Sequence, residues 1–305
     1  MKIIVTGGAG FIGSNLVDRL IRERHHVAVI DNLSTGSKTN INPKARFYKL
    51  DIQSPNIAQV FAKEKPDALF HYAAQIDVRK SWKDPVADAR TNILGSLNLL
   101  EACRKYGVKK IVFASTGGAL YGEASQIPTQ ETYPTNPISA YGAAKLSVEH
   151  YLHAYHVVYG LSVAILRLAN VYGPRQDGKG EAGVVAIFSR TLLQGKQPIL
   201  YGNGTQTRDF VFVEDVVQAN LLAFNHKTSG VWNIGTGKET SISLLLKEIQ
   251  EATGSRKKAR TLPLRPGEQK RSCLNMGKAR RELGWKPTTT MREGLRKTVQ
   301  WMEAV

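Results

Sequence analysis

The sequence predicts an α/β protein built on a doubly wound parallel sheet, and three observations support that prediction. Short apolar runs typical of buried parallel strands recur up to residue 167. Longer segments with helical spacing of apolar side chains separate them, and each is long enough to cross over a sheet. A glycine-rich turn directly follows the first run. Alternation of strand and helix is the order that such a sheet requires.

The expected elements follow this alternation along the chain. We expect strands over residues 2–6, 26–31, 45–49, 68–72, 110–114 and 162–167, and crossover helices over 13–24, 55–65, 84–106 and 139–159. After residue 168 come glycine-rich loops, a helix over 184–194, a strand over 210–213, a helix over 216–224 and a basic tail. We therefore expect a nucleotide-binding domain over 1–168 and a smaller substrate-binding domain over 169–305. No linker separates them, so the boundary is not clean and the chain is free to cross back.

Composition excludes several classes of protein. A chain of 305 residues with 42% hydrophobic residues can bury a sizeable core, which excludes a disordered or fibrous protein. Cys103 and Cys273 allow at most one bridge, and their spacing is not that of a thiolate metal site. The sequence has no apolar run of the length that a membrane span requires. We expect a cytoplasmic protein with no membrane partner and no metal.

The charge is unevenly distributed. The chain carries a net charge of +17, and residues 255–305 hold fourteen Lys and Arg against four Asp and Glu, or +10 of that excess. A basic region suits an anionic ligand and raises nucleic acid as a partner. A solvated surface that keeps the protein soluble explains most of these residues more simply, so nucleic acid is not favoured.

The glycine-rich turn has the features of a dinucleotide site. Gly7, Gly10 and Gly13 lie between the first strand and the first helix. Glycines there permit a tight turn, close approach of a pyrophosphate and packing of helix on strand. Asp31 ends the second strand, where a carboxylate accepts hydrogen bonds from an adenosine ribose and repels a 2′-phosphate. This is the Rossmann arrangement, and it favours NAD over NADP.

A tyrosine and a lysine supply candidate acid–base chemistry. Tyr141 and Lys145 lie four residues apart at the start of the helix expected over 139–159, so they face the same way. A nearby ammonium favours the phenolate and lowers the pKa of a phenol from about 10 toward neutrality. We interpret Tyr141 as a general base.

Together with the glycine turn, this pair resembles the extended short-chain dehydrogenase/reductases, and within them the UDP-glucose (UDP-galactose) 4-epimerase family. The resemblance runs from end to end of the chain. It includes residues 71–75, Asn92, residues 121–122, residues 167–174 and residues 208–215.

The resemblance implies epimerisation at C4 of a UDP-hexose through a transient 4-keto sugar, with NAD tightly held. Tyr141 would take the proton of the 4-hydroxyl, and Lys145 would hold the nicotinamide ribose. The remaining cofactor contacts that it implies are Phe11, Ile12, Asn32, Ser34, Thr35, Gly36, Asp51, Ile52, Ala73, Ala74, Gln75, Asn92 and Ser115.

The family pattern also implies a substrate site and a homodimer. The UDP-sugar contacts it implies are Asn170, the backbone of Val184 and Val185, Tyr201, Arg208, Arg265, Glu268 and Ser272. Ser272 is small, which leaves room for an N-acetyl group at the sugar. The dimer would pair the helices expected over 84–106 and 139–159. Their apolar residues Leu97, Leu100, Val148 and Leu152 supply either that surface or packing on the protein's own sheet.

One position departs from the family pattern. The family has a serine or threonine that binds the 4-hydroxyl where this chain has Gly117. Thr116 is the nearest substitute, and water or Tyr141 alone are the alternatives. We expect Gly117→Ser to be tolerated. Residues 116–119 contain no carboxylate, which disfavours the related dehydratases and decarboxylases.

Two other interpretations remain. A 4-epimerase for UDP-glucuronate uses the same scaffold, and its substrate suits the positive charge. A catalytically silent NAD-binding module would have no need of Tyr141 and Lys145.

Overall fold

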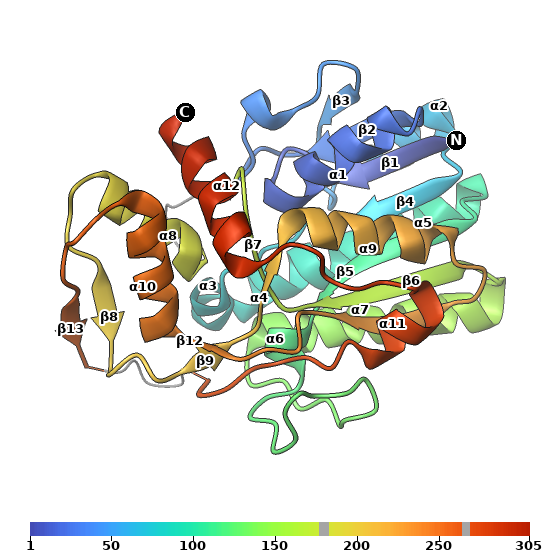
Figure 1. The fold of residues 1–305 in the computed structure, drawn as a ribbon. Coiled ribbons are helices and arrows are strands. Elements are labelled where there is room, and N and C mark those ends of the chain that lie inside the picture. Colours follow the sequence, from blue (N-terminus) through green and yellow to red (C-terminus); the bar gives the residue numbers. More distant parts are fainter. Residues whose placement is uncertain (177–182, 264–268) are drawn as a thin grey trace.

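The computed structural model describes residues 1–176, 183–263 and 269–305. Its centre is a seven-stranded sheet in the order β11-β6-β5-β4-β1-β2-β3, in which every neighbouring pair is parallel (Figure 1). The strands are β1 (Lys2–Thr6), β2 (His26–Asp31), β3 (Arg46–Lys49), β4 (Ala68–His71), β5 (Lys110–Thr116), β6 (Ser162–Leu168) and β11 (Gly230–Ile234). The predicted fold class is confirmed.

Helices cover both faces of this sheet, because its strands present apolar side chains on both sides. One buried cluster joins the sheet to α1 (Phe11–Arg22), α9 (Val213–Asn225) and α11 (Gly277–Leu283). A second joins the opposite face to α2 (Ile57–Glu64), α5 (Gly95–Tyr106) and α7 (Ala140–Tyr159). Short elements connect them: η1 (Lys38–Asn40), α3 (Val78–Lys83), α4 (Pro85–Ala89), η2 (Arg90–Leu94) and α6 (Gly117–Leu120).

The predicted helix over 84–106 is three consecutive segments. α4 is followed by a π-helical turn, η2, and then by α5. Asp84 caps the first segment by accepting from the backbone N–H of Ala87 at 2.9 Å. Apolar spacing is nearly the same in the three segments, so the sequence pattern does not reveal the wider turn.

A smaller lobe has its own apolar core. Its helices are α8 (Val184–Leu193), α10 (Ile242–Thr253) and α12 (Met291–Glu303). Its strand pairs are β7 (Asn170–Tyr172) with β10 (Phe210–Phe212), β9 (Thr207–Arg208) with β12 (Thr240–Ser241), and β8 (Ile199–Tyr201) with β13 (Arg260–Leu262). The C-terminal half also returns to the large sheet, where β11 pairs with β6, α9 packs on β6 and α11 packs on β11 (Figure 1).

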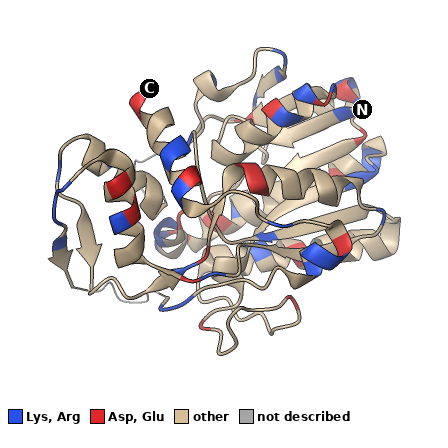
Figure 2. Ribbon diagram, viewed as in Figure 1, with Lys and Arg blue, Asp and Glu red and all other residues tan. Residues whose placement is uncertain are grey.

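The two helices nearest the C-terminus carry charges of both signs, with the basic residues in excess. On α11 the acid Glu282 follows Arg280 and Arg281, and on α12 Glu293 follows Arg292 (blue and red in Figure 2). Lys297 contacts both Glu214 and Glu293 at 3.2 Å. No helix within the described ranges is long and apolar enough to cross a membrane.

Candidate active site

The glycine turn after β1 is a tightly packed cradle. Gly7 has a positive φ of 71°, and a Cβ there would lie 2.6 Å from the backbone N of Ala73. A Cβ on Gly13 would lie 2.2 Å from the carbonyl oxygen of Gly7. Only glycine fits either position, so the backbone after β4 and the first turn of α1 can approach the end of β1 closely.

The first turn of α1 offers free donors to an anion. The helix begins after Gly10 with no side-chain cap, so the backbone N–H groups of Phe11, Ile12 and Gly13 have no intrahelical acceptor. The positive end of the helix dipole adds to their attraction for a negative group. A cradle that a Cβ would fill, next to uncapped N–H groups, fits a dinucleotide pyrophosphate.

Asp31 lies beside this cradle and is buried. Its Oδ2 accepts from the backbone N–H of Ala9 at 3.0 Å, and its Oδ1 accepts from that of Leu33 at 2.8 Å. Each carboxylate oxygen has a second lone pair. The carboxylate can therefore hold the loop in place and still accept from a ligand hydroxyl.

Side-chain hydrogen bonds hold the segment after β2 at the same edge of the sheet. Asn32 donates to Asp51 at 2.7 Å and accepts from the backbone N–H of Ser34 at 2.9 Å. Asp51 also accepts from the backbone N–H of Gln53 at 2.8 Å. The structure thus gathers the segments that carry most of the predicted cofactor residues, including Thr35, Gly36 and Ile52, at the carboxyl ends of β1, β2 and β3.

Hydrogen bonds from Asn92 and Asp88 hold the loop that follows β4. Asn92 accepts from the backbone N–H of Gln75 at 2.9 Å and donates to its carbonyl at 2.9 Å. Asp88 Oδ1 accepts from Gln75 Nε2 at 2.7 Å and from Asn92 Nδ2 at 3.0 Å. Asp88 is 2% exposed, and its Oδ2 has no hydrogen-bond partner among the described residues. The sequence analysis missed Asp88, and its only sequence signal is its position one helical turn before Asn92.

Tyr141 and Lys145 project from the first turns of α7, as their spacing predicts. Ser139 caps the helix by accepting from the backbone N–H of Gly142 at 3.0 Å. The Lys145 ammonium is buried, donates to the carbonyl of Ala114 at 3.0 Å, and lies 6.0 Å from the centre of the Tyr141 ring. The pair therefore lies against the end of β5.

The pKa of Tyr141 differs from the sequence expectation. Burial, and then the carboxylate of Asp88, raise the pKa of Tyr141 rather than lowering it. Burial lowers the pKa of Lys145 to about 8, and the carboxylates of Asp88 and Glu149 oppose that shift. The spacing argument was wrong on this point because it counted one neighbouring charge and omitted desolvation.

The residues at the end of β5 show the contacts of Thr116 and of its neighbour Gly117. Thr116 ends β5, and its Oγ1 accepts from the backbone N–H of Ala119 at 3.3 Å, which leaves the hydroxyl proton free to donate elsewhere. A Cβ on Gly117 would lie 2.4 Å from a methyl group of Leu274, which is 1% exposed. Tolerance of Gly117→Ser therefore depends on movement of the Leu274 side chain. A Cβ on Gly118 would instead lie 3.9 Å from Ser272 Oγ.

The predicted substrate residues come from separate elements of the smaller lobe. Asn170 begins β7, and Val184 and Val185 begin α8, whose first N–H groups have no side-chain cap from the part of the chain that the structure describes. Tyr201 ends β8 and Arg208 lies on β9. Ser272 is buried, and its Oγ lies 3.9 Å from the position of a Cβ on Gly118. Arg265 and Glu268 lie outside the described residues.

Within the described ranges, no group of three or more His, Cys, Asp or Glu side chains is arranged to hold a metal ion. The three histidines His150, His153 and His156 on α7 belong to no such group.

The fold and the site together define a nucleotide-binding α/β protein with a tyrosine–lysine pair at the carboxyl edge of its sheet. The chain belongs to the NAD dependent epimerase/dehydratase family, whose pattern matches residues 3–235. It is 49% identical over 301 residues to a putative UDP-glucose 4-epimerase of Methanocaldococcus jannaschii, covering 99% of this chain and 98% of that one.

Two solved structures are similar over their whole length. The UDP-glucose 4-epimerase of Thermotoga maritima with UDP-glucose is 48% identical, with a TM-score of 0.98 and coverage of 100% of this chain and 99% of that chain. The UDP-glucose 4-epimerase of Thermus thermophilus in complex with NAD is 44% identical, with a TM-score of 0.96 and full coverage of both chains.

Proposed function

We propose that this protein is an NAD-dependent UDP-glucose 4-epimerase that interconverts UDP-galactose and UDP-glucose. The observation that carries the proposal is the tyrosine–lysine pair on α7, which lies against the end of β5 next to Thr116. The relatives named above support the reaction, and the absence of a carboxylate from residues 116–119 separates it from elimination of water or loss of CO2.

The glycine cradle and the N-terminal amides of α1 would hold the NAD pyrophosphate, and Asp31 would bind the adenosine ribose. When bound, NAD supplies a hydride acceptor and donor at C4 of the sugar and, in its oxidised form, a positive charge that favours a nearby phenolate. Lys145, whose ammonium donates to the carbonyl of Ala114, would hold the nicotinamide ribose.

The proton of the sugar 4-hydroxyl moves to and from the Tyr141 oxygen. Burial disfavours the phenolate, so a positive charge nearby is required before the phenol can act as a base. Burial lowers the pKa of Lys145 to about 8, and the carboxylates of Asp88 and Glu149 favour its protonated form. Thr116, whose hydroxyl proton is free, donates to the sugar oxygen in place of the hydroxyl that Gly117 lacks.

The diphosphate of the substrate is bound by the amides of Val184 and Val185 and by the arginines Arg208 and Arg265. Two arginines give charge-assisted hydrogen bonds to phosphate oxygens. Asn170, Tyr201 and Glu268 complete the nucleotide contacts, and Ser272 borders the sugar. A small side chain there admits UDP-N-acetylhexoses beside the plain substrates.

The functional unit is a cytoplasmic homodimer that pairs residues 84–106, which form α4, η2 and α5, with residues 139–159, which include α7. Leu94, Val157 and Val158 are exposed apolar residues at these helices, with 57%, 67% and 67% of their surface accessible. Such a surface is typical of an interface. Leu100 and Leu152, by contrast, pack on the chain's own sheet.

A panel of UDP-sugars tests the proposal. The purified protein with added NAD is incubated separately with UDP-galactose, UDP-N-acetylgalactosamine and UDP-glucuronate, and the C4 epimers are separated and quantified. Inversion of UDP-galactose supports the proposal. Inversion of UDP-glucuronate alone identifies the uronate enzyme instead, and NAD binding with no turnover of any sugar identifies a silent module.

A further inference from the structure

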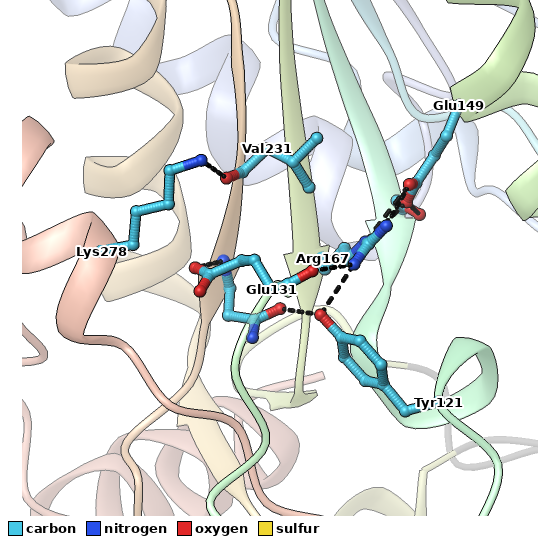
Figure 3. Close-up of polar contacts among 8 residues, drawn as sticks. Tyr121, Glu131, Glu149, Arg167, Val231 and Lys278 are labelled. Atoms are coloured by element: carbon cyan, nitrogen blue, oxygen red, sulfur yellow. Dashed lines mark hydrogen bonds and ion pairs between the residues drawn. The ribbon is translucent and has the colours of Figure 1, made fainter. Parts of the chain in front are cut away.

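A buried polar network holds both ends of the segment that carries Thr116. We call residues 115–121 the Thr116 segment. At its start, the Ser115 hydroxyl donates to Glu149 Oε1 on α7. At its end, the Tyr121 hydroxyl accepts from Arg167 Nη1 at 2.8 Å and donates to Asn233 Oδ1 at 2.8 Å. Figure 3 shows Arg167 reaching Glu149 on one side and Tyr121 on the other.

Glu149 and Arg167 link these two ends to each other. Arg167 Nη2 lies 2.7 Å from Glu149 Oε2, and Arg167 Nε lies 3.1 Å from Glu149 Oε1. Their side chains are 6% and 8% exposed, so the pair is almost completely removed from water. Glu149 lies one helical turn after Lys145 on α7. The same carboxylate therefore connects the catalytic helix to the Thr116 segment.

The network continues to residues 272–275. Asn233 Nδ2 donates to the carbonyl of Thr129 at 2.9 Å. The backbone N–H of Thr129 donates to the carbonyl of Cys273 at 2.9 Å, and the same Thr129 carbonyl accepts from the backbone N–H of Asn275 at 2.8 Å. Residues 272–275 include Ser272 and the Leu274 side chain that packs on Gly117. One connected set of bonds thus fixes three parts of the site.

Stability alone is a weak reason for this arrangement. Removing two charges from water costs several kcal/mol, and a packed apolar pair of similar volume is often as stable or more stable. An ion pair gives what an apolar pair does not, namely directional bonds that hold a hydroxyl in one position. Here the held hydroxyls belong to Ser115 and Tyr121, on either side of Thr116.

From this geometry we propose that Tyr121, Arg167 and Glu149 are positioning residues for the reaction, which fix the Thr116 hydroxyl against the sugar while α7 presents Tyr141. The inference rests on the proposed 4-epimerase function. The family's serine or threonine aligns with Gly117, and Thr116 lies one residue before that position. The position of the Thr116 hydroxyl therefore depends on how the Thr116 segment is held, and not only on where β5 ends.

A double-mutant cycle tests this role. Tyr121→Phe removes one hydroxyl without emptying its site, and Thr116→Ala removes the group that it positions. We expect Tyr121→Phe to lower kcat for UDP-galactose about tenfold, as loss of one hydrogen bond to a charged group implies. KM should stay within about twofold, because the UDP contacts are elsewhere. In the Thr116→Ala background, Tyr121→Phe should have no further effect on kcat.

Controls separate positioning from general stability. Tyr48→Phe removes a hydroxyl bonded to Glu64 at the far edge of the sheet, and we expect it to leave kcat unchanged. Ser115→Ala removes the anchor at the other end of the segment, and its effect should likewise vanish in the Thr116→Ala background. It serves as the second arm of the test if Tyr121→Phe does not fold.

The contrary results are distinct. Two results would overturn the positioning role: effects on kcat that multiply in the double variant, or a Tyr121→Phe protein with a lower Tm and an unchanged kcat. Neither result affects the 4-epimerase function, because that function is shown by turnover of the wild type. A wild-type protein that inverts no UDP-sugar overturns the proposed function, and this inference with it.

Discussion

Replacing Gly117 with alanine tests the packing of the Thr116 segment. A Cβ at this position would lie 2.4 Å and 2.6 Å from the two methyl groups of Leu274. Leu274 is 1% exposed, so its methyl groups would have to move within a packed interior to make room. Overpacking of this kind costs about 1–3 kcal/mol in free energy of unfolding. The neighbouring variant, Gly118→Ala, is the matched control because its Cβ would meet only Ser272 Oγ, at 3.9 Å.

Both glycines lie in the short helix α6, so each alanine brings the same gain in helix propensity, about 0.5–1 kcal/mol. The difference between the two variants therefore isolates the clash. We expect Gly117→Ala to be about 1–3 kcal/mol less stable than Gly118→Ala, measured by urea unfolding under the same conditions. Equal stability of the two variants would refute the packing argument. It would also restore Gly117→Ser as a route to the missing hydroxyl.

Three further predictions concern catalysis. Asp88→Asn removes a carboxylate that raises the pKa of both Tyr141 and Lys145. Both pKa values should fall, and the pH profile of kcat/KM should move to lower pH. An unchanged profile, or a move to higher pH, would contradict the influence of Asp88 on this pair. Thr116→Ala should lower kcat for UDP-galactose about tenfold, whereas an unchanged kcat assigns the 4-hydroxyl contact to water or to Tyr141 alone. Ser272→Tyr should abolish kcat/KM for UDP-N-acetylgalactosamine and spare UDP-galactose, and equal loss on both substrates would remove the size-selection role.

Local patterns explain why so much of the large sheet was predictable. Apolar runs and helical spacing depend on residues near one another in sequence, and β2 was predicted over 26–31 as the structure has it. The glycines at 7 and 13 and the acid at 31 act within one βαβ unit, so their spacing reveals the cradle. Tyr141 and Lys145 share a helix, so their common direction follows from helical geometry.

The remaining features depend on contacts between distant parts of the chain. Leu274 closes the space at Gly117 from 157 positions away, and Asp88 approaches Tyr141 only once α4 packs on α7. Desolvation of the Tyr141 phenol likewise depends on the folded environment, which is why the direction of its pKa shift was wrong. β11 joins the large sheet beside β6, and its own sequence shows only a short apolar run.

The assignment of Tyr141 as the group that moves the proton is tested most directly by one comparison. The initial rate at which UDP-galactose is converted to UDP-glucose is measured for the wild type, for Tyr141→Phe and for Tyr151→Phe. Tyr151 lies on the same helix with its side chain exposed, so its variant controls for a lost tyrosine hydroxyl on α7. The proposed mechanism predicts a fall of at least about 10²-fold for Tyr141→Phe and none for Tyr151→Phe. Near wild-type turnover by Tyr141→Phe would contradict it.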